Sequence, residues 1–201
     1  MYSDRFVDPL PDPQHYADNP PSDEDEISLK LVKAAPTNQT YSVFYDPDYA
    51  KFERLVLKQG KGLIANSILK KTMAHIKHVQ VKKYHEASEA EKSTIEVNPL
   101  KVFHEALNNV KPIVSVRNLK HGANTYRVPH MLNPDKQFFI ASKWMLEFIR
   151  SGKPDTPASL RLGNEVLAAY NYQGHSVKKK VELHKIAEAN RAYAHFRWGK
   201  R

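Results

Sequence analysis

In PIVSVRNLKHGANTYRVPH, residues 112–130, a strand pattern interrupts a series of helical patterns. Two runs rich in β-branched residues, VSVR (114–117) and TYRV (125–128), flank a segment with the composition of a turn. The stretch therefore predicts a β-hairpin. A two-stranded ribbon is only marginally stable alone, so it either packs on helices or protrudes and is ordered by a partner. The cations in and around it, Arg117, Lys120, His121 and Arg127, favour a protruding ribbon that contacts phosphates over a simple surface hairpin.

Helical patterns lie on both sides of the ribbon. Asp46-Pro47, Asn98-Pro99 and Thr156-Pro157 each place proline at the first position of a helix, and Gly60 is suited to a helix end. The predicted helices are 47–59, 63–80, one that begins at 98–99, 134–151, 157–173 and 176–198, with 81–97 as a solvated connection. We expect a mainly α fold: about six helices in a bundle with one protruding β-hairpin, plus an extended N-terminal arm.

The N-terminal residues differ in composition from the rest. Residues 1–45 hold six of the thirteen prolines and the acidic run 23–26, without a sustained period. We expect an extended acidic arm over 1–45 and a helical domain over 46–201. The acidity of the arm argues against a transit peptide, which would be rich in arginine.

Charge is strongly segregated along the chain. The net charge of +9 combines 3 basic and 10 acidic residues in 1–50, a net of −7, with 28 basic and 12 acidic residues in 51–201, a net of +16. A domain this basic repels itself unless a polyanion neutralises it. Nucleic acid is therefore favoured over an anionic membrane face or an acidic protein partner.

Several classes of function lack a signature in the sequence. The chain has no cysteine, and no apolar run approaches the roughly 20 residues of a membrane helix. His75 and His78 are spaced i, i+3 but lack a nearby carboxylate that would complete a metal site. No phosphate-binding glycine loop is present, and nothing in the sequence marks a catalytic triad. We expect neither catalysis, nor a cofactor, nor a metal.

The C-terminal helix combines small, aromatic and basic residues. The residues Leu183, Ile186, Ala187, Ala194 and Trp198 fall on one arc of a continuous helix and predict its seam to the domain. Ala192, on the open side, would let a bulky partner approach the backbone. The run Lys178-Lys179-Lys180 lies at the start of the helix, where cations oppose the macrodipole, so it favours a phosphate partner. An ordinary amphipathic basic helix is the alternative.

The ending KIAEANRAYAHFRW (185–198) closely resembles the signature ending of the small-subunit ribosomal protein seven family. The similarity also covers NPLKVFHEALNNVKPIVSVR (98–117), GANTYRVP (122–129) and the helix with Lys143-Trp144, so it runs over nearly all of 46–198. It implies a helical core of about six helices with a protruding ribbon. It also implies a structural role in translation: binding the 3′ major domain of small-subunit rRNA, organising assembly of the head, and placing the ribbon near the exit site for mRNA and tRNA.

Carried over by position, the resemblance implies two sets of contact residues. The rRNA-binding set is Lys58, Lys61, Lys136, Lys143, Lys178, Lys179, Lys180, His184, Asn190, Arg191 and Arg197. The ribbon set, on the side of mRNA and exit-site tRNA, is Arg117, Lys120, His121, Gly122, Tyr126 and Arg127. Tyr126 is a candidate to stack on a splayed base.

The chain departs from the bacterial pattern of the family. It has Leu119-Lys120 where bacterial members tend to have two arginines, and Lys136-Gln137-Phe138 in place of an arginine cluster, so some rRNA contacts are expected to be lost or moved to neighbouring proteins. The arm with DPLPDPQHY and the connection KKYHEASEAEKSTIEVNP look like the animal mitochondrial branch. The implied location is the mitochondrial matrix, as part of the ribosome.

The resemblance also implies the partners. These are small-subunit rRNA, mRNA, exit-site tRNA and the neighbouring small-subunit proteins nine and eleven, without a membrane and without self-assembly into a homo-oligomer. Two alternatives remain open: a free helical RNA-binding regulator outside the ribosome, and an enzyme acting on nucleic acid with His184 or His195 as a general base.

Overall fold

The computed structural model describes residues 3–8, 31–35, 40, 42, 44–121, 123–151 and 155–198. The chain divides into two units, Met1–Phe52 and Glu53–Arg201. In the first unit, β1 (Phe6–Val7) pairs in parallel with β2 (Leu31–Val32), and Lys33 Nζ donates to Asp8 Oδ1 at 2.8 Å. The acidic run 23–26 of the predicted arm lies outside the described residues, and the predicted boundary at 45/46 stays a prediction.

Helix α3 (Pro47–Val56) begins where the Asp46-Pro47 pair predicts. Asp46 Oδ1 accepts hydrogen bonds from the backbone N–H groups of Asp48 at 2.9 Å and Tyr49 at 3.1 Å, and so caps the first turn. The helix ends three residues before the predicted end. The reason is local: Gln59 and Gly60 have φ angles of 54° and 71°, which a continuing helix does not allow.

Helix α4 (Gly62–Glu86) is longer than the predicted 63–80, and a one-turn helix, α5 (Glu89–Lys92), follows it. The predicted solvated connection 81–97 is therefore partly helical. Lys82 and Glu86 approach to 3.9 Å at i, i+4, and the Ser88 N–H donates to Glu91 Oε2 at 3.2 Å at the start of α5. These polar pairs support helix in a segment that has little apolar periodicity.

The helical core of the second unit consists of α4, α6 (Pro99–Val110), α7 (Pro134–Ser151) and α8 (Ala158–Tyr170). Helix α8 packs against α4, α6 and α7. The side chains that fill the core are fully or almost fully buried: Leu69, Ile76, Val102, Phe103, Ala106, Leu107, Val110, Met145, Leu162 and Val166. In α6 they follow the i, i+1, i+4, i+5, i+8 spacing of a buried helix face. The sequence predicts this face from Phe103, Ala106, Leu107 and Val110.

Close contacts fix the crossing of α4 and α8. The Thr72 hydroxyl donates to the carbonyl oxygen of Ser159 at 3.1 Å, and His75 Nε2 lies 2.8 Å from Asn164 Oδ1. A Cβ at Gly163 would lie 2.6 Å from His75 Cδ2, so only glycine allows this approach without a shift. In the sequence, Ile64 and Ile68 form a second apolar stripe on this helix and predict that it is covered on two sides. That prediction is wrong for Ile64, which is 55% exposed, because Ala65, Leu69 and Thr72 supply the single buried face.

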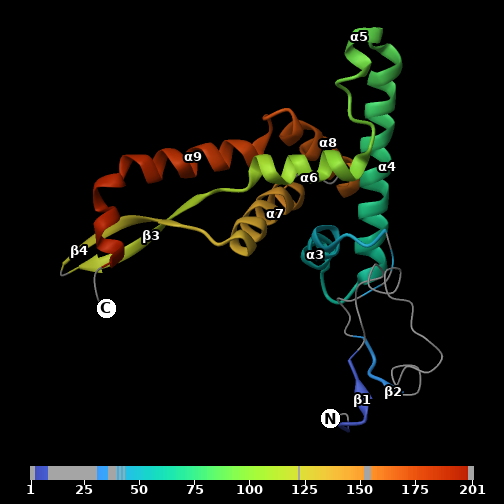
Figure 1. Cartoon of the computed structure of the whole chain (residues 1–201). Helices are drawn as coiled ribbons and strands as arrows, with labels where there is room; N and C mark the ends of the chain where they lie inside the picture. The colour runs from blue at the N-terminus through green and yellow to red at the C-terminus, as the bar shows by residue number, and fades with distance from the viewer. Residues whose placement is uncertain are drawn as a thin grey trace. The chain divides into compact units, whose positions relative to one another are not determined.

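The predicted hairpin is confirmed. Strands β3 (Val114–His121) and β4 (Asn124–Met131) form an antiparallel ribbon with Val114 opposite Met131 and Lys120 opposite Thr125. Helix α9 (His175–Ala189) runs alongside the ribbon, and a 3₁₀ segment, η1 (Arg191–Trp198), folds back onto it (Figure 1). We call β3, β4, α9 and η1 together the distal arm.

The prediction of one continuous helix over 176–198 is wrong. Helix α9 ends at Ala189, and Asn190 adopts φ −101° and ψ 15° while its side-chain amide donates to the carbonyl oxygen of Ile186 at 2.7 Å. The predicted seam breaks with it: Ala187 is buried, but Ile186 and Ala194 are exposed. The break redirects the chain so that its last aromatic residues reach β4.

Across the part of the chain that the structure describes, the fold is mainly helical, with six helices of ten residues or more and one antiparallel hairpin. This confirms the fold class expected from the sequence. No helix in the described ranges is long and apolar enough to span a bilayer.

Candidate nucleic-acid interface

Helix α9 begins on a carboxylate from the helical core, and this contact sets the direction of the distal arm. Glu165 Oε1, buried in α8, accepts from the backbone N–H of Ser176 at 2.7 Å. Gly174, the N-cap residue just before α9, has a φ of 96°, and a Cβ there would lie 3.1 Å from Glu165 Oε1. A glycine is therefore needed for both the conformation and the close approach. The start of α9 is occupied by the protein's own anion.

The root of the ribbon is tied to α9 by a histidine. His184 Nε2 accepts a hydrogen bond from the backbone N–H of Ile113 at 3.3 Å, just before β3. Burial lowers the pKa of His184, and the neighbouring Lys180 ammonium lowers it further. A neutral imidazole is required here, because only the unprotonated nitrogen accepts a hydrogen bond. His184, predicted to bind rRNA, thus has a structural partner.

The other end of the ribbon is held by aromatic packing. The ring centroid of Tyr126 lies 5.1 Å from that of Tyr193 and 5.2 Å from that of Phe196, both in η1. The ring centroids of His195 and Phe196 lie 4.2 Å apart, and His195 Nδ1 is 2.8 Å from the Ala192 carbonyl oxygen. Tyr126, predicted to stack on a base, therefore already contacts rings of its own chain. The ribbon is packed along its length rather than free-standing.

The register of the ribbon distributes its cations over both faces. Tyr126, opposite Leu119, and Val128, opposite Arg117, are on one face, because directly paired residues share a face. Arg127 and Lys120 belong to the other face, and both are exposed. Arg117 is also exposed but lies on the face of Tyr126. The side chain of His121 is not described, and Gly122 lies outside the described residues.

The three lysines at the start of α9 differ from one another. Lys178 is exposed and has no hydrogen-bond or ion-pair partner among the described residues. Lys179 Nζ lies 3.0 Å from Glu147 Oε2 of α7, which lowers the pKa of that carboxyl. Lys180 Nζ donates to the Asn109 carbonyl oxygen at 2.8 Å, and burial lowers its pKa. Only Lys178 is thus fully available to a phosphate.

The remaining predicted rRNA-binding residues occupy several elements. Arg191 and Arg197 are exposed on η1, whereas Asn190 caps α9. Lys136 and Lys143 are exposed on α7, and Lys58 and Lys61 are exposed in the link between α3 and α4. The distal arm brings the α9, η1 and ribbon residues together, and Lys143 of α7 acts with Lys179 of α9 on the same carboxyl group, Glu147, whose pKa both ammonium groups lower. Lys58 and Lys61 belong to a different element.

The distal arm is strongly basic for its size. Residues 114–131 and 175–198 contain nine Lys and Arg and two Glu, which are Glu182 and Glu188. Among the nine, Lys179 and Lys180 donate to oxygen atoms of Glu147 and Asn109. Such an excess of cations on a thin, exposed element favours contact with a polyanion.

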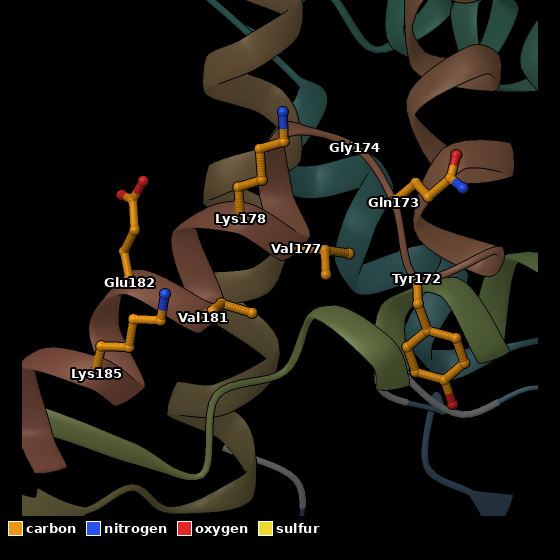
Figure 2. A pocket seen from close by; sticks show the side chains of 8 residues that line it. All are labelled: Tyr172, Gln173, Gly174, Val177, Lys178, Val181, Glu182 and Lys185. Carbon is orange, nitrogen blue, oxygen red and sulfur yellow. The ribbon is translucent and has the colours of Figure 1, made fainter.

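A groove that sequence reasoning missed lies beside α9. It has a volume of about 580 Å³ and is lined by the loop Tyr172, Gln173 and Gly174 and by the α9 residues Val177, Lys178, Val181, Glu182 and Lys185 (Figure 2). Tyr172 is 72% exposed and Val181 is 45% exposed. The i, i+4, i+8 spacing of Val177, Val181 and Lys185 was a signal in the sequence, but the position of Tyr172 depends on the turn.

A second groove lies on the first half of α4. It is lined by Glu53, Gly62, Leu63, Asn66, Ser67, Lys70 and Lys71. Leu63 is almost fully exposed, and Lys70 and Lys71 add two exposed cations close to the predicted Lys61. The basic surface around the α3–α4 link is therefore larger than the sequence pattern indicated.

The histidines do not form a chemical site in the described part of the chain. No group of three His, Asp or Glu residues there has the arrangement of a metal site. His75 packs on Gly163, and His184 accepts a backbone hydrogen bond, so neither is directed at a substrate. The geometry supports binding rather than catalysis.

Comparisons with known proteins agree with the resemblance seen in the sequence. The family model described as ribosomal protein S7p/S5e matches residues 28–191. The small ribosomal subunit protein uS7m of Xenopus laevis is 42% identical over 98% of this chain and 88% of its own length, and that of Gallus gallus is 39% identical over the same shares. The bacterial uS7 of Desulfatibacillum aliphaticivorans is 33% identical over 74% of this chain and 85% of its own length.

Proposed function

The chain belongs to the ribosomal protein S7p/S5e family and to its animal mitochondrial branch, and on that premise we propose that it organises the small-subunit head by binding the 3′ major domain of the rRNA. It is a structural, non-enzymatic component of the mitochondrial small ribosomal subunit. The observation that carries the finer proposal is the distal arm, where nine Lys and Arg accompany two Glu.

The mechanism is electrostatic. Exposed cations neutralise phosphates of neighbouring rRNA helices and release their counterions, which stabilises an RNA arrangement that would otherwise repel itself. Duplex RNA is recognised by its shape and backbone, so the protein needs fixed spacing between cations rather than base contacts. The helical core supplies that spacing through Glu165, Thr72 and the buried face of α6.

The predicted contact residues divide into two groups under this proposal. Lys58, Lys61, Lys136, Lys143, Lys178, Arg191 and Arg197 are the direct rRNA contacts. Lys179, Lys180, His184 and Asn190 have intramolecular partners, so we assign them first to holding the distal arm in place.

The ribbon is proposed to serve the exit path of mRNA and tRNA. Arg127 and Lys120 are exposed on the face opposite to Tyr126 and would meet phosphates there. Tyr126 itself would hold the ribbon against η1. For protein neighbours, the acidic N-terminal residues offer charge complementarity to other basic ribosomal proteins, and small-subunit proteins nine and eleven are the proposed partners.

The test is crosslinking of the tagged protein to RNA in mitochondria, followed by sequencing of the RNA and sedimentation of the complex. Crosslinks concentrated in the 3′ portion of small-subunit rRNA, in fractions of ribosomal size, are expected. Crosslinks spread over mRNA or tRNA in light fractions would instead indicate a free RNA-binding regulator.

A further inference from the structure

The loop between α8 and α9 is a rigid support for an exposed aromatic ring. The Tyr172 and Gln173 N–H groups donate to the carbonyl oxygens of Ala169 at 3.1 Å and Ala168 at 2.8 Å, and the Asn171 side chain donates to that of Leu167 at 3.0 Å. Tyr172 has a φ of 56°, a conformation uncommon for a bulky residue. The turn therefore fixes Tyr172 in an exposed position before any partner arrives.

The other wall of the groove is aliphatic. Val177 and Val181 point from α9 into the space between that helix and the loop, and Tyr172 lies across from them (Figure 2). The groove is thus lined by an exposed aromatic ring from the loop and by branched aliphatic groups from α9, a combination that suits a planar group. Unpaired nucleobases are commonly held in this way, on an aromatic face with apolar contacts around them.

The rim of the groove carries a net positive charge. Lys178 and Lys185 are exposed on α9 two helical turns apart, and Glu182 lies between them in the sequence. None of the three has an ion pair among the described residues. A phosphodiester chain is attracted by the two lysines and repelled by Glu182.

We propose that this groove binds one unpaired nucleotide of RNA, with its base on Tyr172 against Val177 and Val181 and its backbone phosphates at Lys178 and Lys185. This inference rests on the rRNA-binding role proposed above and gives it a specific subsite. The net positive rim, on an arm with nine basic and two acidic residues, favours a nucleotide over a protein segment.

The test uses the full chain and a transcript of the 3′ domain of mitochondrial small-subunit rRNA that carries 4-thiouridine. Tyr172→Asn removes the ring, and asparagine tolerates positive φ, so the turn is kept. Tyr172→Phe is the matched control that retains the ring. Loss of one stacked base is expected to weaken binding roughly five- to tenfold in Tyr172→Asn but not in Tyr172→Phe.

Two further readouts locate the effect. Crosslinks to the wild-type chain are expected within residues 172–185, and Glu182→Gln is expected to strengthen binding, because it removes a charge that repels phosphate. Thermal unfolding of each variant shows whether the fold is kept.

The outcomes separate this inference from the role on which it rests. Wild-type affinity in Tyr172→Asn, with crosslinks only outside 172–185, overturns the nucleotide subsite and leaves the rRNA-binding role intact. A wild-type chain that does not bind the transcript overturns both. In assembled subunits, a photoreactive group at position 172 that attaches to a protein rather than to RNA assigns the groove to a protein neighbour and also overturns the proposal.

Discussion

The helical core and the distal arm of this protein are held together by different interactions. In the core, α4, α6 and α8 share a continuous set of fully buried apolar side chains such as Leu69, Phe103 and Val166. In the distal arm, a few specific contacts hold the ribbon: His184 at its root and Tyr126 near its turn. The distal arm carries many cations, and burying a charge is costly, so it has few buried apolar contacts. Its conformation therefore depends on individual side chains.

The difference shows how the conformation of a strongly basic surface is stabilised. Cations that repel one another destabilise a thin element, and the protein offsets this with partners for selected lysines and with aromatic packing. Lys180 and Lys178 lie two residues apart on α9, yet one has a carbonyl partner and the other has none among the described residues. The same residue type thus serves the fold at one position and binding at the other.

The largest effect is expected from a change in the core. Phe103→Ala removes a side chain that is 1% exposed and should lower the free energy of unfolding by about 3–5 kcal/mol, because a cavity remains. Urea unfolding followed by circular dichroism measures this. Loss of less than about 1 kcal/mol would show that the core is not the main source of stability.

A smaller and local effect is expected from the aromatic contact of the distal arm. Tyr126→Ala should lower the free energy of unfolding by about 1–2 kcal/mol and speed hydrogen exchange in β3 and β4. Exchange in α6 and α8 should stay unchanged, since the rings that Tyr126 contacts, Tyr193 and Phe196, lie in η1. Tyr126→Phe keeps the ring and is the control. Equal acceleration of hydrogen exchange in the helical core and in the distal arm would contradict the separation of the two regions.

The smallest effect concerns pH. The pKa of His184 is lowered in the folded chain from its ordinary 6.5, so the unfolded chain binds the proton more readily. The stability that His184 contributes is therefore complete above pH 6.5 and is lost as pH falls below that value through the folded pKa. Hydrogen exchange at the ribbon root should increase over this window.

His184→Gln provides the matched control for that pH dependence. Glutamine offers an oxygen acceptor that does not titrate. Hydrogen exchange at the Ile113 N–H always varies with pH for intrinsic chemical reasons, and in this variant most of the additional variation with pH should disappear. A pH profile identical to that of the wild-type chain would remove His184 as its source.

Much of the fold was predictable from the sequence, and the failures have local causes. The proline-bearing starts at Asp46 and Asn98 and the apolar face of α6 are encoded by neighbouring residues, so they were found. The break at Asn190 was not, because it depends on the docking of Tyr193 and Phe196 onto a distant strand. The apolar spacing of a helix continues in the sequence beyond Asn190, but tertiary packing ends the helix there.

The candidate site was predictable in composition but not in role. Sequence patterns identified the basic residues of α9 and the ribbon, yet they gave no sign that Lys179 would meet Glu147 or that Lys180 would meet the backbone of Asn109. Both partners lie more than 30 residues away in the chain. The Tyr172 groove was missed for a related reason, since the turn at Gly174 creates it.

The most direct test of the account compares Lys178→Glu with Lys180→Glu in the full chain, with rRNA affinity and thermal unfolding measured for both. Lys178→Glu should weaken binding of the 3′-domain transcript and leave the melting temperature unchanged. The slope of log affinity against log salt concentration should fall by about one, as expected for the loss of one phosphate contact. Lys180→Glu should lower the melting temperature by several degrees, because a carboxylate would face the Asn109 carbonyl oxygen. Equal melting temperatures and equal affinities in the two variants would contradict the division between cations that bind RNA and cations that hold the fold.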